Sequence, residues 1–166
     1  GSSDSWVGLK VLVTAGPTQE ALDPVRCLTN HSTGRMGYAV ARAAAARWAE
    51  VTLVSGPTAL KKPAYVETVD VVSAQDMFEA VSARAEESDL IFKAAAVADY
   101  TPCDYSGDKI KKKEGDLSIP LKRTVDILSW LGEHRRPGQV ICGFSMETRD
   151  MVANSQAKLE KKKVDM

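Results

Sequence analysis

The sequence predicts an α/β fold in which a mostly parallel sheet carries helices on both faces. Two observations lead to this prediction. Short apolar segments alternate along the chain with segments that have helical periodicity. The apolar segments are also nearly continuous, which is typical of strands that are covered on both faces. The 166 residues are enough for one domain with a sizeable core.

The first half of the chain predicts three strands and two helices. Residues 9–16 (LKVLVTAG) are an apolar run ended by Gly-Pro, and residues 50–57 have the same ending. The alanine-rich segment 34–49 between them predicts a helix. Residues 64–73 alternate enough to form a third strand. In residues 73–88 the apolar side chains recur on one face of a helix.

The second half continues the alternation. Residues 89–97 (DLIFKAAAV) predict a largely buried strand, and residues 126–134 predict a short helix. Residues 117–122 contain a proline and therefore suit an edge strand. Residues 139–147 predict a further strand, and residues 150–163 predict a helix with lysines in its last turn, where they suit the helix dipole.

The two ends of the chain also carry predictions. Val164-Asp165-Met166 resembles the beginning of another strand after the last helix. An α/β unit normally returns such a strand, so we expect the domain formed by residues 9–166 to be truncated before its last strands. Residues 1–8 begin with Gly-Ser and have no apolar signal-peptide region, and we interpret them as a tag or linker.

Composition excludes several classes of function. The net charge is zero, with 22 basic and 22 acidic residues, which gives no electrostatic case for nucleic acid or an anionic membrane as a partner. No apolar run approaches the roughly 20 residues that span a bilayer. Cys27, Cys103 and Cys142 are widely spaced, so a disulfide framework or zinc site is not expected, and a cytoplasmic location fits best.

Small and polar residues crowd the beginning of the helix predicted at 34–49: Asn30, His31, Ser32, Thr33, Gly34 and Gly37. A helix N-terminus presents unpaired N–H groups with the positive end of the dipole behind them, which makes it a ready anion site. The alternative is ordinary N-capping by Ser32 or Thr33. These residues alone leave both interpretations open.

The loop after the strand at 89–97 is the second informative segment. Ala94 to Ala98 are small enough for a flat ring to approach the backbone, and Asp99 follows them. Lys109 and three further lysines lie about ten residues later. Lysines bind phosphates as point charges, and a nearby carboxylate can hold a ribose hydroxyl or a metal ion. The alternative is that the lysine run is only a solvated surface.

The sequence lacks the fingerprints of the common nucleotide-binding loops. The turn after the first strand reads TAGPTQEA, which lacks the G-x-G-x-x-G of dinucleotide sites. The second strand ends in Ser55-Gly56-Pro57, where an NAD site would carry an acidic residue. GxxxxGK[ST] is also absent, which excludes a P-loop. An NAD(P)-dependent oxidoreductase and a catalytically inert nucleotide-binding module remain as alternatives.

Four segments in this order, VTAGPTQEALDPVRCLTNHSTGRMG, AAAVADY, DKIKKK and GFSMET, resemble the bacterial phosphopantothenate–cysteine ligase family. This is the phosphopantothenoylcysteine synthetase of coenzyme A biosynthesis, and the resemblance covers nearly the whole chain after residue 8. It implies a Rossmann-like sheet, a homodimer, and ligation of 4′-phosphopantothenate to cysteine through an acyl-cytidylate with CTP and Mg²⁺. FMN is expected only if a decarboxylase domain belongs to the same protein.

The resemblance also implies roles for individual residues. Asn30 and Lys109 match the catalytic positions, and Asp99 and Asp126 match positions that hold Mg²⁺. The residues that match nucleotide-binding positions are Gly16, Ser32, Gly34, Ala95, Ala96, Asp99, Lys109, Lys112 and Phe144. Thr33 and Arg35 stand where the family usually has Ser and Lys. Thr124-Val125 stands where the family often has Asn-Pro, so the backbone before Asp126 is expected to differ.

Overall fold

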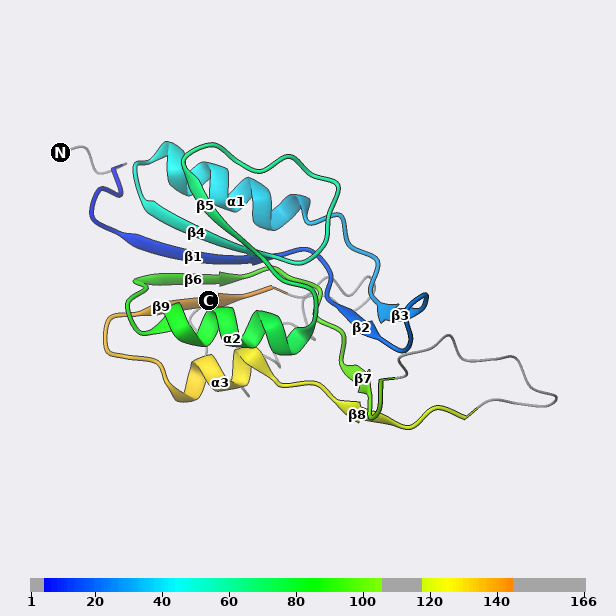
Figure 1. Cartoon of the computed structure of the whole chain (residues 1–166). Coiled ribbons are helices and arrows are strands. Elements are labelled where there is room, and N and C mark those ends of the chain that lie inside the picture. Colours follow the sequence, from blue (N-terminus) through cyan, green and yellow to red (C-terminus); the bar gives the residue numbers. More distant parts are fainter. Residues whose placement is uncertain (1–4, 106–117, 145–166) are drawn as a thin grey trace.

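A five-stranded, wholly parallel sheet forms the centre of the protein, as predicted (Figure 1). A computed structural model describes residues 5–105 and 118–144. The strand order is β5-β4-β1-β6-β9. The strands are β1 (Lys10–Ala15), β4 (Glu50–Ser55), β5 (Val66–Asp70), β6 (Leu90–Lys93) and β9 (Val140–Gly143). The helices are α1 (Arg35–Ala46), α2 (Ala74–Ala85) and α3 (Ile127–Glu133).

The helices cover both faces of this sheet, which confirms the predicted layers (Figure 1). On one face, α1 buries Tyr38, Ala41 and Ala44 against residues of β1 and β4. On the other face, α2 and α3 bury a second apolar core that includes Met77 and Leu131. The inner strands β1 and β4 are therefore largely buried, which explains why their sequences are nearly continuous apolar runs.

Two small antiparallel ribbons lie outside the main sheet. One pairs β2 (Gln19–Ala21) with β3 (Cys27–Thr29), inside a segment predicted only as a loop. The other pairs β7 (Tyr100–Pro102) with β8 (Leu121–Arg123). The short edge strand expected at residues 117–122 corresponds to β8, which begins later, at Leu121, and pairs with β7 rather than with the parallel sheet.

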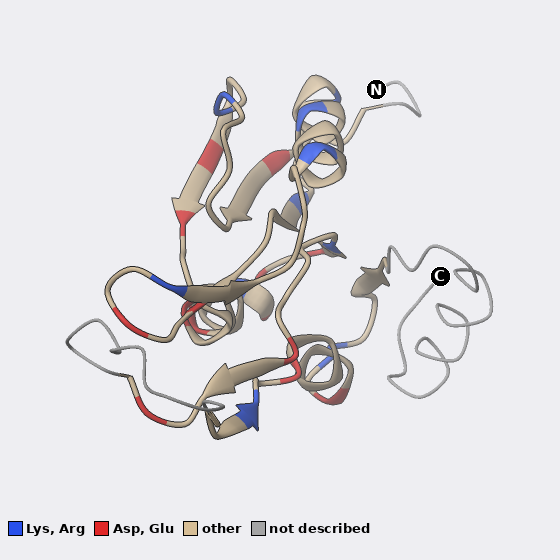
Figure 2. Cartoon of the chain, turned by 90° about the vertical axis from the view of Figure 1, so that its right-hand side faces the viewer, with Lys and Arg blue, Asp and Glu red and all other residues tan. Residues whose placement is uncertain are grey.

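Other sequence expectations fall on residues that the structure does not describe. These are the lysine run of the loop after β7, the helix at 150–163 and the strand beginning at 164–166. Within the described ranges, no helix is long and apolar enough to cross a membrane. Figure 2 shows basic and acidic residues interspersed over the described elements, in keeping with the zero net charge.

Helix α1 ends in a turn that places a tryptophan in an unfavourable backbone conformation. The N–H of Ala49 donates to Ala44 O at 3.1 Å, and the N–H of Trp48 donates to Ala45 O at 3.0 Å. This pair of bonds is the Schellman pattern, whose left-handed residue is usually glycine. Trp48 holds that position with φ of 70°, and 75% of it is exposed.

We expect Trp48→Gly to raise the free energy of unfolding by about 1 kcal/mol, because the left-handed conformation costs a side-chain-bearing residue about that much. Trp48→Ala is the matched control, since it also removes the ring but keeps the strain. Urea denaturation of the three proteins measures the difference. Equal stability of the glycine and alanine variants would contradict the expectation.

Candidate functional site

A cavity of about 1150 Å³ lies at the carboxyl-terminal edge of the parallel sheet. It is formed by the segment that leads into α1, the loop after β6, the beginning of α3 and the end of β9. The first of these follows β1, and β1 and β6 are neighbours in the sheet at the point where the strand order reverses. Parallel sheets bind their ligands at this kind of position. The cavity is therefore the leading candidate for a functional site.

The beginning of α1 forms one wall of the cavity. Gly34 is the N-cap residue, and no side chain caps the helix. Ser32 Oγ accepts the N–H of Gly34 at 3.3 Å, and Thr33 Oγ1 accepts the N–H of Arg35 at 3.4 Å. These short-range bonds shape the turn before the helix but are not the usual bond to the N–H of the second or third helical residue. The alternative in which Ser32 or Thr33 caps the helix is therefore wrong.

Gly34 and Gly16 pack against each other behind this wall. Gly34 has φ of 79° and Gly16 has φ of 78°, both in the left-handed region that favours glycine. A Cβ on Gly34 would lie 3.0 Å from Thr58 Cγ2 and 3.4 Å from the backbone of Gly16. Gly16 does not line the cavity itself. It supports the position of Gly34, which does.

The loop after β6 is fixed by buried threonines. Thr14 Oγ1 accepts the N–H of Ala95 at 3.2 Å, and Thr18 Oγ1 accepts the N–H of Ala98 at 2.9 Å. Both threonines are fully buried. From the other side, the hydroxyl of Thr124 donates to Ala98 O at 2.6 Å. Three hydroxyl groups therefore hold the small-residue loop against the strands and the segment before α3.

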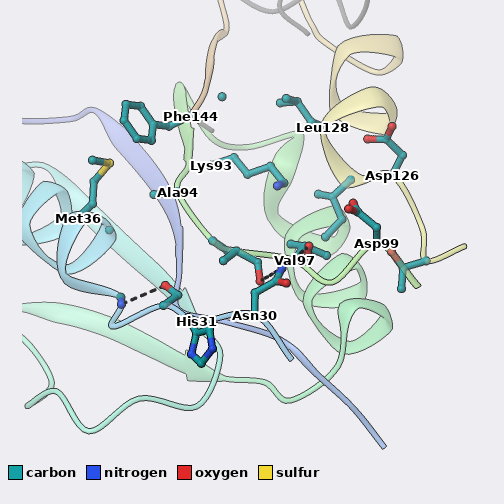
Figure 3. A pocket seen from close by; sticks show the side chains of 18 of the residues that line it. Asn30, His31, Met36, Lys93, Ala94, Val97, Asp99, Asp126, Leu128 and Phe144 are labelled. Atoms are coloured by element: carbon teal, nitrogen blue, oxygen red, sulfur yellow. Dashed lines mark hydrogen bonds between the residues drawn. The ribbon is translucent and has the colours of Figure 1, made fainter. Parts of the chain in front are cut away.

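Asn30 joins the wall at α1 to the loop after β6. Its Nδ2 donates to Val97 O at 3.2 Å and to Ala96 O at 3.5 Å (Figure 3). Asn30 lies four residues before Gly34 and does not cap α1, so a capping role for this side chain is excluded. Asn30 lines the cavity and is an exposed residue.

Two carboxylates lie on another side of the cavity. Asp99 follows the small-residue loop, and Asp126 is the N-cap of α3, where it accepts the N–H of Ser129 at 3.1 Å. Carboxylate oxygens suit Mg²⁺, which usually takes only one or two from the protein and the rest from phosphates and water. The described residues contain no group of three or more His, Cys, Asp or Glu that could hold a metal ion. Two carboxylates are as many as a Mg²⁺ of this kind usually takes from the protein.

The structure brings most of the predicted site residues together. The cavity is lined by Asn30, Ser32, Gly34, Ala95, Ala96, Asp99, Asp126 and Phe144. Lys109 and Lys112 lie outside the described residues. Sequence reasoning did not assign Lys93 or Arg123, which also line the cavity. The signal for Lys93 was present, because it is the single charged residue inside the apolar run 90–98.

The cysteines take no part in the cavity. Cys27 and Cys103 are exposed, and Cys142 is buried in β9. Burial raises the pKa of the Cys142 thiol, which keeps it protonated. The lining residues in the described part of the chain include no cysteine.

Comparison with known proteins gives a consistent result. Residues 6–166 match the family model of the "DNA/pantothenate metabolism flavoprotein C-terminal domain". The chain is 48% identical over 160 residues to the "Coenzyme A biosynthesis bifunctional protein CoaBC" of Bacillus subtilis (strain 168). That alignment covers 96% of this chain and 39% of the relative, so the chain spans about two fifths of the length of such curated relatives.

Solved structures agree with this match. The crystal structure of the C-terminal domain of a coenzyme A biosynthesis bifunctional protein CoaBC superposes with a TM-score of 0.83 at 46% identity. It covers 98% of this chain and 76% of that one. A Cab2 mutant in complex with phosphopantothenate-cysteine has a TM-score of 0.82 at 16% identity, covering 95% of this chain and 70% of that one. The second likeness shows a shared fold.

Proposed function

Because this chain belongs to the DNA/pantothenate metabolism flavoprotein C-terminal domain family, we propose that it is a phosphopantothenate–cysteine ligase. In this proposal it joins 4′-phosphopantothenate to L-cysteine at the expense of CTP, as a step of coenzyme A biosynthesis. It works as a homodimer in the cytoplasm. FMN belongs to the proposal only if a decarboxylase domain is part of the same protein.

The observation that carries the proposal is the set of residues that line the cavity. It combines an uncapped helix beginning, an amide side chain at Asn30 and two carboxylates at Asp99 and Asp126 along one sheet edge. A phosphorylated acid and a nucleotide both need N–H donors and cations near their phosphates. A volume of about 1150 Å³ lies just above the usual range for a small-molecule site.

The reaction has two steps. The carboxylate of 4′-phosphopantothenate attacks the α-phosphorus of CTP, forming an acyl-cytidylate and releasing pyrophosphate. The amine of cysteine then attacks the acyl carbon, forming the amide, while CMP leaves with the electron pair of the broken acyl–oxygen bond and the amine gives up a proton.

Each step needs different help from the protein. The first brings an anion to a polyphosphate, so positive charge matters more than a base, and we assign Lys109 and Lys112 to it. The second builds negative charge on the acyl oxygen, and the neutral amide of Asn30 is suited to donate to it. Bound at Asp99 and Asp126, Mg²⁺ would neutralise phosphate charge.

We place the cytosine ring along Ala95, Ala96 and Asp99, with Phe144 at the same cavity. The threonine bonds keep the backbone of this loop close to β1, so a base can lie against its small side chains. We propose that CTP is preferred to ATP at this position. We place a phosphate beside Ser32 and Gly34 at the beginning of α1, where the positive end of the helix dipole favours an anion.

An assay on the whole chain tests the proposal. The protein is incubated with CTP, Mg²⁺, 4′-phosphopantothenate and cysteine, and mass spectrometry follows the amide product and CMP. Thermal shifts with CTP, ATP and NADPH run in parallel, since a bound ligand raises stability by mass action. Stabilisation by NADPH with none by CTP would favour the oxidoreductase. Binding of CTP without any product would favour the inert module.

A further inference from the structure

Lys93 is a cation of the cavity that the two reaction steps above do not use. It is the last residue of β6, next to Thr14 of β1 on one side and Gly143 of β9 on the other. Its carbonyl accepts the N–H of Phe144 at 3.0 Å. The backbone of Lys93 is therefore held between two neighbouring strands, at the carboxyl-terminal end of β6.

The direction of the Lys93 side chain follows from the alternation of side chains along β6. Ile91 belongs to the core under α2 and α3, whereas Phe92 packs against the core under α1. Lys93 therefore leaves the sheet on the α2–α3 side, at the end of the strand. It is half-buried and lines the cavity. Figure 3 shows it extending into the cavity, with its nitrogen toward the side of Asp99 and Asp126.

The chemical setting suits an anion. An ammonium group carries three donors and loses hydration when it is confined, so a half-buried lysine is stabilised by negative charge close to it. Lys93 follows the apolar residues Leu90, Ile91 and Phe92, and a neutral side chain would fit that strand at lower solvation cost. The cavity also carries two carboxylates, but a ligand with several phosphate charges brings more negative charge than they do.

We propose that Lys93 binds a phosphate group of the ligand and thereby makes the cavity selective for phosphorylated ligands. This inference rests on the proposed function and adds a specificity-determining residue to it. The phosphate has two possible sources, the nucleotide and the phosphorylated acid. Both present the same chemistry to an ammonium group, and binding experiments separate them.

Calorimetry on the whole chain compares two pairs of ligands in the presence of Mg²⁺: CTP against cytidine, and 4′-phosphopantothenate against pantothenate. We expect Lys93→Met to lower the affinity for one phosphorylated ligand by about 10- to 100-fold, the usual range for a hydrogen bond to a charged group. The affinity for the phosphate-free counterpart of that ligand should change less than threefold. The ligand that weakens identifies the source of the phosphate. Lys93→Arg should recover most of the affinity.

Lys10→Met is the matched control. Lys10 is the first residue of β1, at the amino-terminal end of the strands, whereas the cavity lies at their carboxyl-terminal end. Its ammonium group lies 3.9 Å from Glu87 Oε2. This variant should bind all four ligands as the unmodified chain does. Thermal unfolding of each variant reports whether the fold is intact.

The outcomes separate the two proposals. If the unmodified chain makes product but Lys93→Met binds every ligand with unchanged affinity, the Lys93 inference is wrong and the proposed function stands. If phosphorylated and phosphate-free ligands weaken equally and the melting temperature falls, Lys93 has a structural role and the inference is again wrong. If the unmodified chain binds neither CTP nor 4′-phosphopantothenate, the proposed function fails and the inference fails with it.

Discussion

Asn30→Asp is expected to slow formation of the amide by about 10²- to 10³-fold, the loss typical of removing one preorganised donor, while the acyl-cytidylate still forms. The change is nearly isosteric but replaces a donor with an anion beside the developing oxyanion. Capture of the acyl group by cysteine should therefore fail, and the acyl-cytidylate should accumulate. Mass spectrometry of a quenched reaction detects it directly.

The structure adds a second effect to this variant. The Nδ2 group of Asn30 donates to Val97 O at 3.2 Å, and a carboxylate at the same place would face the carbonyl oxygens of Val97 and Ala96 without a proton to share. If this contact is the whole role of Asn30, both half-reactions should slow together and no acyl-cytidylate should build up. A normal rate of product formation would remove Asn30 from the mechanism altogether.

Gln75→Glu serves as the control for the amide-to-acid change. Gln75 lies on α2 and is exposed, and its Nε2 donates to Glu79 Oε1 of the same helix at 3.4 Å. It does not line the cavity. We expect this variant to make product at the normal rate.

Lys109→Gln is expected to reduce pyrophosphate release by about 10²- to 10³-fold, because it removes a charge that offsets the triphosphate and the leaving pyrophosphate. A coupled pyrophosphate assay with CTP and 4′-phosphopantothenate, without cysteine, measures this half-reaction alone. Lys122→Gln is the control, since Lys122 is exposed on β8 and does not line the cavity. An unchanged rate for Lys109→Gln would contradict the assigned role.

The inner strands of the main sheet could be predicted because they are largely buried on both faces. Residues such as Leu12, Leu53 and Ile91 are fully buried, and this burial produces the apolar runs that the sequence displays. The small ribbons could not be predicted in the same way. All three residues of β8 are exposed, as are those of β3, so no hydrophobic pattern marks them.

The site was predicted in part for a different reason. Asn30 and Asp99 stand in loops, where polar side chains are conspicuous and match the ligase family. Lys93 could not be assigned from its neighbours, because they predict a buried strand. Strand periodicity does not show which side chain borders a cavity at the end of the strand. Contacts such as the one between Thr18 and Ala98 join residues 80 positions apart and depend on the folded arrangement.

The threonine bonds to the loop after β6 have a consequence for how tightly a ligand can be bound. A loop that must first become ordered lowers the population that is competent to bind, and the apparent affinity falls by that fraction. Thr14 and Thr18 hold Ala95 and Ala98 in place before any ligand arrives. Little conformational entropy then remains to be lost in this part of the cavity on association. This loop is thus preorganised for binding, and any conformational change on binding is expected in other segments around the cavity.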